Sequence, residues 1–393
     1  MKRVYLDHIA ATPLDPQAVE AMLPYLGEKY GNPQSLHSAG QEALGAVQEA
    51  RSRVARLIGA EENEIFFTSS GSEANNFAVK GMALARRDRN RHLVVSAIEH
   101  QSVLHSVKSL EKFGFSSTLV PVDRDGLVDP EDVKRALKKE TALVSVILAS
   151  SEVGTIEPLA EIARVCRSAG IPLHTDAVAA AGNIPLEVRE LDVDALSLAA
   201  DQFYGPKGSG ALFLRKGTRI LPFIDGGIQE GGRRSGTENV AGIVGMGQAA
   251  ELALTKLAER GERLSSLRDR LIEHLPQKVG RVYLTGHREK RLPHHASFCV
   301  EFIEGESMLL NLDMKGIAAS SGSACTSRAL KASHVLLAMG IDHALAQGSL
   351  VFSLIDNTTA ADIDYLLDVF PPIIDRLRKM SPLYTKFLEE NEK

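Results

Sequence analysis

Residues 64–87, EIFFTSSGSEANNFAVKGMALARR, decide the fold: they predict a short apolar strand at 64–68 that turns directly into a helix at 72–87. The same succession continues along the chain. Further strands are predicted at 92–97, 118–122, 142–149, 172–176, 195–199 and 210–215, with helical segments between most of them, such as 101–113, 130–137 and 159–168. This alternation predicts an α/β fold with a mostly parallel seven-stranded sheet covered on both faces.

The regular alternation of predicted strands and helices ends at about residue 236, and the connections between strands become longer after it. A long amphipathic helix is predicted at 239–275. It is followed by strands at 281–285, 296–301 and 350–354 and by helices at 306–313 and 360–378. We therefore expect a large α/β domain at 14–260 and a small α+β domain formed by 1–13 and 261–393.

Composition excludes several classes of protein. Of the 393 residues, 44% are hydrophobic and 24% are charged, which argues against a disordered chain. A net charge of -5 gives no electrostatic reason to expect a nucleic-acid or anionic-membrane partner. Neither a secretory signal nor an apolar run of roughly 18 residues is present, so a cytoplasmic protein with reduced thiols is expected.

The three cysteines, Cys166, Cys299 and Cys325, are too few and too far apart for a disulfide framework or a self-contained metal cluster. Cys166 falls in a predicted helix and Cys299 in an apolar strand, so both are expected to be packing residues. Cys325 lies in the small polar stretch SSGSACTS at 320–327, where an exposed and reactive thiol is expected.

Two strand ends carry candidate ligand-binding residues. The turn TSSGSEA at 68–74 would offer free backbone N–H groups to a phosphate, or Ser72 could simply cap the helix. Asp176, in HTDA at 174–177, ends a strand where ligands bind in open α/β sheets, or it could be a helix cap. Neither pattern alone decides between its two interpretations.

Taken in order, these motifs resemble the cysteine desulfurases of iron–sulfur cluster assembly, which are fold-type-I enzymes that use pyridoxal phosphate (PLP). The resemblance covers essentially the whole chain. The stretches that carry it are YLD at 5–7, GNP at 31–33, SGSEANN at 70–76, EH at 99–100, HTDA at 174–177, YGPKG at 204–208, RSGT at 234–237 and SGSACTS at 321–327.

The resemblance implies a homodimer with PLP at the subunit interface. Asp176 would pair with the pyridine nitrogen and His100 would stack on the ring. Gly71 and Ser72, with Thr237 of the other subunit, would hold the phosphate.

A cysteine in the position of Cys325 carries a persulfide from the substrate to a scaffold protein in this family. Cys325 is therefore the expected catalytic thiol.

The chain departs from the family where the cofactor would be anchored. The family has Ser-Gly-His-Lys before the YGPKG turn, and its lysine forms the Schiff base; here Asp201 stands at the histidine position and Gln202 at the lysine position. A glutamine amide cannot form an imine. Lys207 belongs to the separate YGPKG turn. Covalently bound PLP is therefore not expected, and the PLP-binding residues are interpreted as vestigial or weak.

Other family residues that would face the cofactor or substrate are also replaced, and we expect them to share one pocket. The phosphate serine is Ala199, the asparagine beside the cofactor is Ser151, the glutamine partner of the phenolic oxygen is Ala179, and the arginine for the substrate carboxylate is Val351. Asp201 adds a like charge near the phosphate, which costs on the order of 4 kcal/mol at ~4 Å in an effective dielectric of about 20.

Two hypotheses follow. The first is a dimeric, non-desulfurating partner of an iron–sulfur scaffold protein, in which Cys325 accepts sulfur or serves as one metal ligand of a shared cluster. In this hypothesis Asp176 and His100 have become structural. The second is an active PLP-dependent desulfurase or lyase that binds PLP non-covalently. A third, an unrelated binding role on the same fold, is disfavoured by the intact cysteine stretch.

Overall fold

The computed structural model describes residues 2–322 and 332–391. Its largest sheet has seven strands in the order β2-β8-β7-β6-β5-β3-β4. Neighbouring strands are parallel except where β8 pairs with β2 and β7, which confirms the mostly parallel sheet. The strands are β2 (Ile65–Thr68), β3 (His92–Ser96), β4 (Ser116–Val120), β5 (Thr141–Ser145), β6 (Leu173–Asp176), β7 (Ala195–Ala199) and β8 (Gly210–Leu214).

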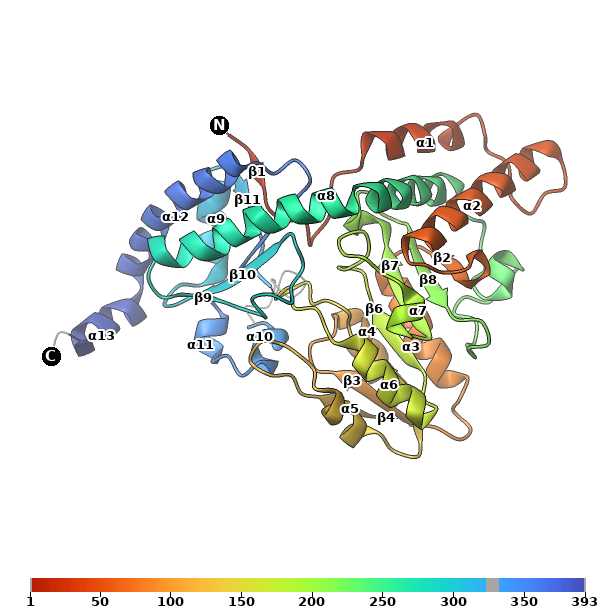
Figure 1. The fold of residues 1–393 in the computed structure, drawn as a ribbon, viewed down its shortest axis with the longest axis horizontal. Coiled ribbons are helices and arrows are strands. Elements are labelled where there is room, and N and C mark those ends of the chain that lie inside the picture. Colours follow the sequence, from red (N-terminus) through yellow and green to blue (C-terminus); the bar gives the residue numbers. More distant parts are fainter. Residues whose placement is uncertain (1, 323–331, 392–393) are drawn as a thin grey trace.

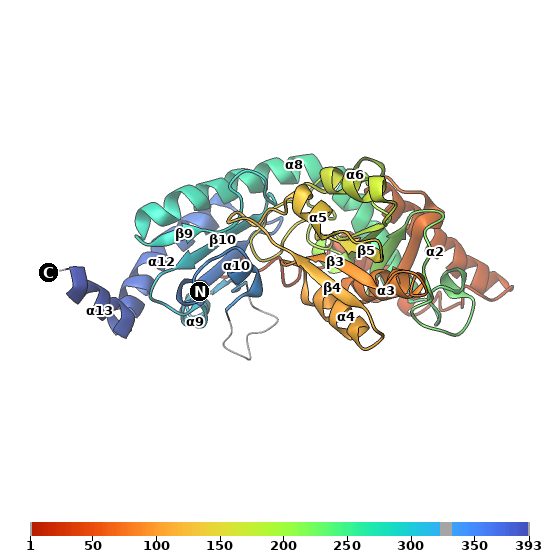
Figure 2. The ribbon, with the colours of Figure 1, turned by 90° about the horizontal axis from the view of Figure 1, so that it is seen from below.

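Helices cover both faces of this sheet, because successive strand side chains point to opposite sides. Leu93 and Val95 pack in the core formed with α3 and α4, whereas Val94 packs in the core on the opposite face. Figure 2 shows α3 and α4 on one side of the strands and α5 and α6 on the other. The helices of this part are α1 (Pro16–Leu26), α2 (Ser38–Leu57), α3 (Gly71–Leu84), α4 (Gln101–Glu111), α5 (Pro130–Ala136), α6 (Leu159–Ala169) and α7 (Val188–Leu191).

A second core lies around a three-stranded antiparallel sheet in the order β12-β10-β9. The N-terminal strand β1 joins this part by pairing in parallel with β11. The elements are β1 (Val4–Tyr5), β9 (Val282–Leu284), β10 (His295–Val300), β11 (Ile317–Ala318), β12 (Ser349–Ser353), α9 (Gly305–Asp313), α10 (His334–Ala338), α11 (His343–Ala346), α12 (Ala360–Met380) and α13 (Pro382–Asn391).

Helix α8 (Val240–Lys278) runs along both parts of the molecule (Figure 1). Met246 and Ala250 in its first half pack in the core of the large sheet, whereas Leu264 and Leu271 in its second half pack in the smaller core. The proposed domain boundary between 260 and 261 falls within this helix. No helix of the described chain is both long and apolar enough to cross a membrane.

Candidate functional site

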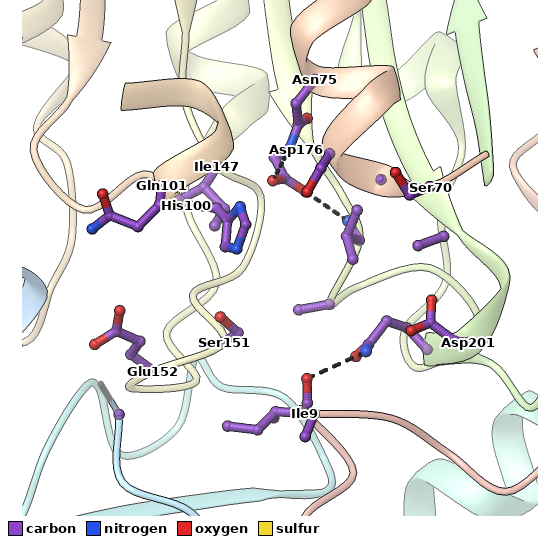
Figure 3. A pocket seen from close by; sticks show the side chains of 18 of the residues that line it. Ile9, Ser70, Asn75, His100, Gln101, Ile147, Ser151, Glu152, Asp176 and Asp201 are labelled. Carbon is purple, nitrogen blue, oxygen red and sulfur yellow. Dashed lines mark hydrogen bonds between the residues drawn. The ribbon is translucent and has the colours of Figure 1, made fainter. Parts of the chain in front are cut away.

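A cavity of about 450 Å³ opens at the carboxyl ends of the parallel strands (Figure 3). The segments that follow β2, β3, β5, β6 and β7 all reach it, as expected where the ends of parallel strands meet at one edge of a sheet. Residues of the N-terminal segment and of the small part close the remaining sides. The predicted site residues Gly71, Ser72, His100, Asp176 and Gln202 all line it.

One other predicted site residue, Thr237, does not line the cavity of the described single chain. Thr237 is exposed, and its approach to the cavity of a partner subunit stays a prediction. Cys325 lies outside the described residues. However, Gly322 and Ser333, which precede and follow the segment 323–331, both line the cavity.

Helix α3 directs its N-terminus at the cavity. Its cap is Ser70, whose Oγ accepts a hydrogen bond from the Glu73 N–H at 3.1 Å, so the interpretation of Ser72 as the cap is wrong. The first-turn N–H groups have no intrahelical partners and form the positive end of the helix dipole. Gly71 is required by close packing, because a Cβ there would lie 2.5 Å from Val178 Cγ2. This end of the cavity can therefore bind an anion.

Asp176 is buried and belongs to a chain of hydrogen bonds that ends at His100. Its Oδ1 accepts from the Val178 N–H at 2.9 Å, and its Oδ2 accepts from Asn75 Nδ2 at 2.6 Å. Asn75 Nδ2 also donates to Ser102 Oγ at 2.9 Å.

His100 Nδ1 accepts from the Ser102 N–H at 3.1 Å and lies 2.7 Å from its Oγ. His100 also caps α4. Asp176 and His100 therefore both make structural hydrogen bonds, and both face the cavity. The neutral ring must carry its proton on Nε2.

Gln202 is held in the cavity wall by the N-terminal segment. Its Nε2 donates to the Ile9 carbonyl oxygen at 3.3 Å, and its backbone carbonyl oxygen lies 3.0 Å from His8 Nε2. Beside it, burial raises the pKa of Asp201, against the opposing charge of Lys207. Lys207 itself is exposed and does not line the cavity.

The other replaced positions divide into two groups. Ser151, Ala179 and Ala199 line the cavity as expected. Val351 does not, so the expectation that all the replaced residues share one pocket is wrong. Val351 is buried in β12, where its backbone exchanges hydrogen bonds with Ser320 at 2.7 and 3.2 Å.

The described lining of the cavity is acidic. It contains the carboxyl groups of Glu152, Asp176 and Asp201 and the imidazoles of His100 and His334, and none of its described residues is a lysine or arginine. Asn75, Glu152 and His334 were missed as candidates. Asn75 stands inside the quoted stretch SGSEANN, and Glu152 directly follows the replaced position Ser151. Ser333 before His334 is a helix-cap signal that could have drawn attention to this segment.

The two described cysteines are packing residues, as predicted. Cys166 in α6 and Cys299 in β10 are buried, and burial raises the pKa of each thiol to about 12. Within residues 2–322 and 332–391, no group of three His, Cys, Asp or Glu side chains is arranged to hold a metal ion.

Comparison with known proteins gives one consistent result. Residues 4–366 match the aminotransferase class-V family. The chain is 50% identical over 383 residues to "Cysteine desulfurase IscS" of Dictyoglomus turgidum, covering 97% of both chains. It is 48% identical over 393 residues to the protein of the same name from Clostridium botulinum, covering 100% of this chain and 99% of that protein. A solved structure of a "NifS-like protein" matches with a TM-score of 0.90 and 38% identity, over 96% of this chain and 100% of that one.

Proposed function

Because the chain belongs to the cysteine desulfurases of aminotransferase class V, we propose that it serves iron–sulfur cluster assembly without a lysine anchor for PLP. In this proposal it works as the dimeric partner of a cluster scaffold protein and offers the thiol of Cys325. The names of its relatives favour an active desulfurase, which is the second candidate below.

The observation that carries the proposal is Gln202 in the cavity wall. By the family resemblance this is the position of the lysine, and an amide nitrogen is not nucleophilic. None of the other described lining residues supplies an amine. Its hydrogen bond to Ile9 gives Gln202 a structural place in the wall.

PLP is the cofactor of the family. The described lining residues could hold its ring, but they include no lysine that could form a Schiff base with it. Asp176 is a buried carboxylate with lone pairs left for a pyridinium N–H, His100 faces the cavity, and the N-terminus of α3 is an anion site. When bound, PLP supplies an electron sink. The neighbouring Asp201 opposes the phosphate charge.

In the first candidate function, the reacting group is the Cys325 thiolate. As a sulfur acceptor, it would displace a thiolate from a donor persulfide and keep the outer sulfur, with no net oxidation. As a metal ligand, it would complete a cluster whose other ligands come from the scaffold. The positions of Gly322 and Ser333 at the cavity and the burial of the other two cysteines support Cys325 as this thiol.

The test is anaerobic reconstitution of the full chain with ferrous iron, sulfide and the scaffold protein encoded by the same genome. The shared cluster should form with wild type and with Cys166→Ala, and should be lost with Cys325→Ala. If Cys325→Ala binds cluster as well as wild type does, the ligand role is wrong.

The second candidate is a PLP-dependent cysteine desulfurase that binds PLP non-covalently. The hydrogen-bonded chain from Asp176 through Asn75 to His100 supports it, because it retains a site for the cofactor ring. An absorption spectrum distinguishes the two candidates. A PLP band that shifts when cysteine is added, with sulfide released, would favour this second function and overturn the first.

A homodimer is part of both candidates. Tyr30, Leu36 and Ile228 are 85%, 95% and 78% exposed in the single chain, so covering them with a partner would remove apolar surface from water. Ile228 lines a cavity of about 390 Å³ with Gln34, whose amide donates to Glu238 at 2.9 Å, so residues 30–36 lie near the 228–238 segment. Thr237 belongs to the same segment. These exposed residues support an interface there.

A further inference from the structure

Glu152 lies next to two described residues on either side of the segment 323–331, Gly322 and Ser333. Ser333 Oγ donates to Glu152 Oε2, and the same Oγ accepts from the N–H groups of Val335 and Leu336 at 3.1 and 3.2 Å. The two N–H groups occupy the oxygen lone pairs, so the hydroxyl proton is directed at Glu152. Gly322 passes so close that a Cβ there would lie 3.2 Å from Glu152 Oε2.

His334 approaches the other oxygen of Glu152. Its Nε2 lies 3.0 Å from the Glu99 carbonyl oxygen, an obligate acceptor, so the ring proton sits on Nε2. Its Nδ1 accepts from Gln101 Nε2 at 3.1 Å and lies 3.9 Å from Glu152 Oε1. The structure therefore fixes a neutral imidazole beside the carboxyl group.

The surroundings of Glu152 leave it able to change its protonation state near neutral pH. Burial raises its pKa to about 7, against the hydrogen bond from Ser333, and burial lowers the pKa of His334. The other described titratable groups facing this cavity are His100, Asp176 and Asp201, and His295 of β10 bonds the Ser151 carbonyl oxygen at 2.8 Å. The side chain of Glu152 is 19% exposed, and it lines the cavity.

We propose that Glu152 is the proton-transfer group of the cavity for thiols. Its carboxylate takes the proton of a thiol that enters: the S–H bond breaks, its electron pair stays on sulfur, and an O–H bond forms on the carboxyl group. The carboxylic acid later returns the proton, and no oxidant or reductant is needed. Ser333 and His334 are positioning residues. The inference rests on the proposed function only in taking a thiol as the ligand.

The test is the rate of Cys325 alkylation by iodoacetamide between pH 5 and 9, followed by mass spectrometry of the full-length protein without PLP. Cys166 and Cys299 are buried, and Cys325→Ala reports any residual labelling. Wild type should show a rate step near pH 7, where Glu152 ionises. Glu152→Gln should lose this step and react on the order of tenfold more slowly at pH 7.

Two further variants sharpen the result. Glu152→Asp should retain a step, and Ser333→Ala should move it to higher pH, because the hydrogen bond that favours the carboxylate is lost. Glu157→Gln is the matched control, since Glu157 is also buried with a pKa raised to about 8 but does not line the cavity. It should leave the profile unchanged.

The proposal is overturned if Glu152→Gln has the wild-type profile. It is also overturned if Glu152→Gln reacts faster at pH 7, because a carboxylate acting only through its charge would hold the thiol protonated. The measurement uses neither PLP nor a cluster. The outcome of the alkylation measurement therefore does not depend on either candidate function. An unchanged alkylation profile would not argue against cluster formation.

Discussion

The Nε2 of Gln202 donates to the carbonyl oxygen of Ile9 across 3.3 Å. The Nε2 of His8, the residue before Ile9, lies 3.0 Å from the backbone carbonyl oxygen of Gln202. The N-terminal segment thus contacts residue 202 at both its side chain and its backbone. A lysine placed here would enter the same cavity wall, beside Asp201 (Figure 3).

Gln202→Lys alone should recover little desulfurase activity. The amine would restore the anchor, but Asp201 would still oppose the phosphate, and the described lining offers no lysine or arginine for a substrate carboxylate. Sulfide release from cysteine and the absorption spectrum check this. Gln202→Lys with Asp201→His should bind PLP at least about tenfold more tightly than the single variant, since one like charge is removed. Robust turnover by the single variant would show that the anchor alone was limiting.

Asp176→Ala should destabilise the fold and weaken any PLP binding. The change leaves the Val178 N–H and Asn75 Nδ2 without their acceptor, and a buried unsatisfied donor costs about 1–3 kcal/mol. Denaturant unfolding measures the first effect and PLP titration the second. Asp176→Asn keeps an acceptor for Val178 and should cost less stability. Wild-type stability of Asp176→Ala would contradict the buried network.

The sequence predicts the main sheet well because its signals are local. The apolar strand at 64–68 and the glycine turn after it are visible as β2 and the start of α3, and Asp176 ends β6 as expected. Parallel strands then force these ends to one edge, so most candidate residues meet without further information.

The parts that could not be predicted depend on long-range contacts. Glu152 meets Ser333 across 181 positions of sequence, and no local pattern indicates such a pair. The two-residue strands β1 and β11 exist only because they pair with each other. Helix α3 begins at Gly71, so its cap is Ser70 and not Ser72. The exact residue at which a helix begins depends on backbone geometry.

Leu36→Glu or Ile228→Glu should shift the protein from dimer to monomer. Each places a charge on a side chain that is 95% or 78% exposed in the single chain and that we assign to the interface. Light scattering coupled to size-exclusion chromatography measures the mass. Leu119→Glu, on the edge strand β4 and 55% exposed, is the control and should stay dimeric. Dimers of wild-type strength in both variants would place the interface elsewhere.

Glu157→Gln should make the free energy of unfolding less dependent on pH between about pH 4.5 and pH 8. Glu157 is 4% exposed, its Oε2 accepts from the Val128 N–H at 2.8 Å, and burial raises its pKa from 4.5 to about 8. The folded state therefore keeps a proton that the unfolded state releases above its ordinary pKa. Stability from this group is full below pH 4.5 and falls as the pH rises through about 8.

The measurement is chemical denaturation at pH 6 and pH 9. Wild type should lose on the order of 2 kcal/mol more than Glu157→Gln over this range, because a neutral amide has no buried charge to form. Glu161→Gln is the matched control on α6, where the carboxylate is 50% exposed and pairs with Arg164 at 3.4 Å. It should follow the wild-type pH dependence. An equal loss in Glu157→Gln and wild type would mean that Glu157 is already ionised in the folded protein at pH 6.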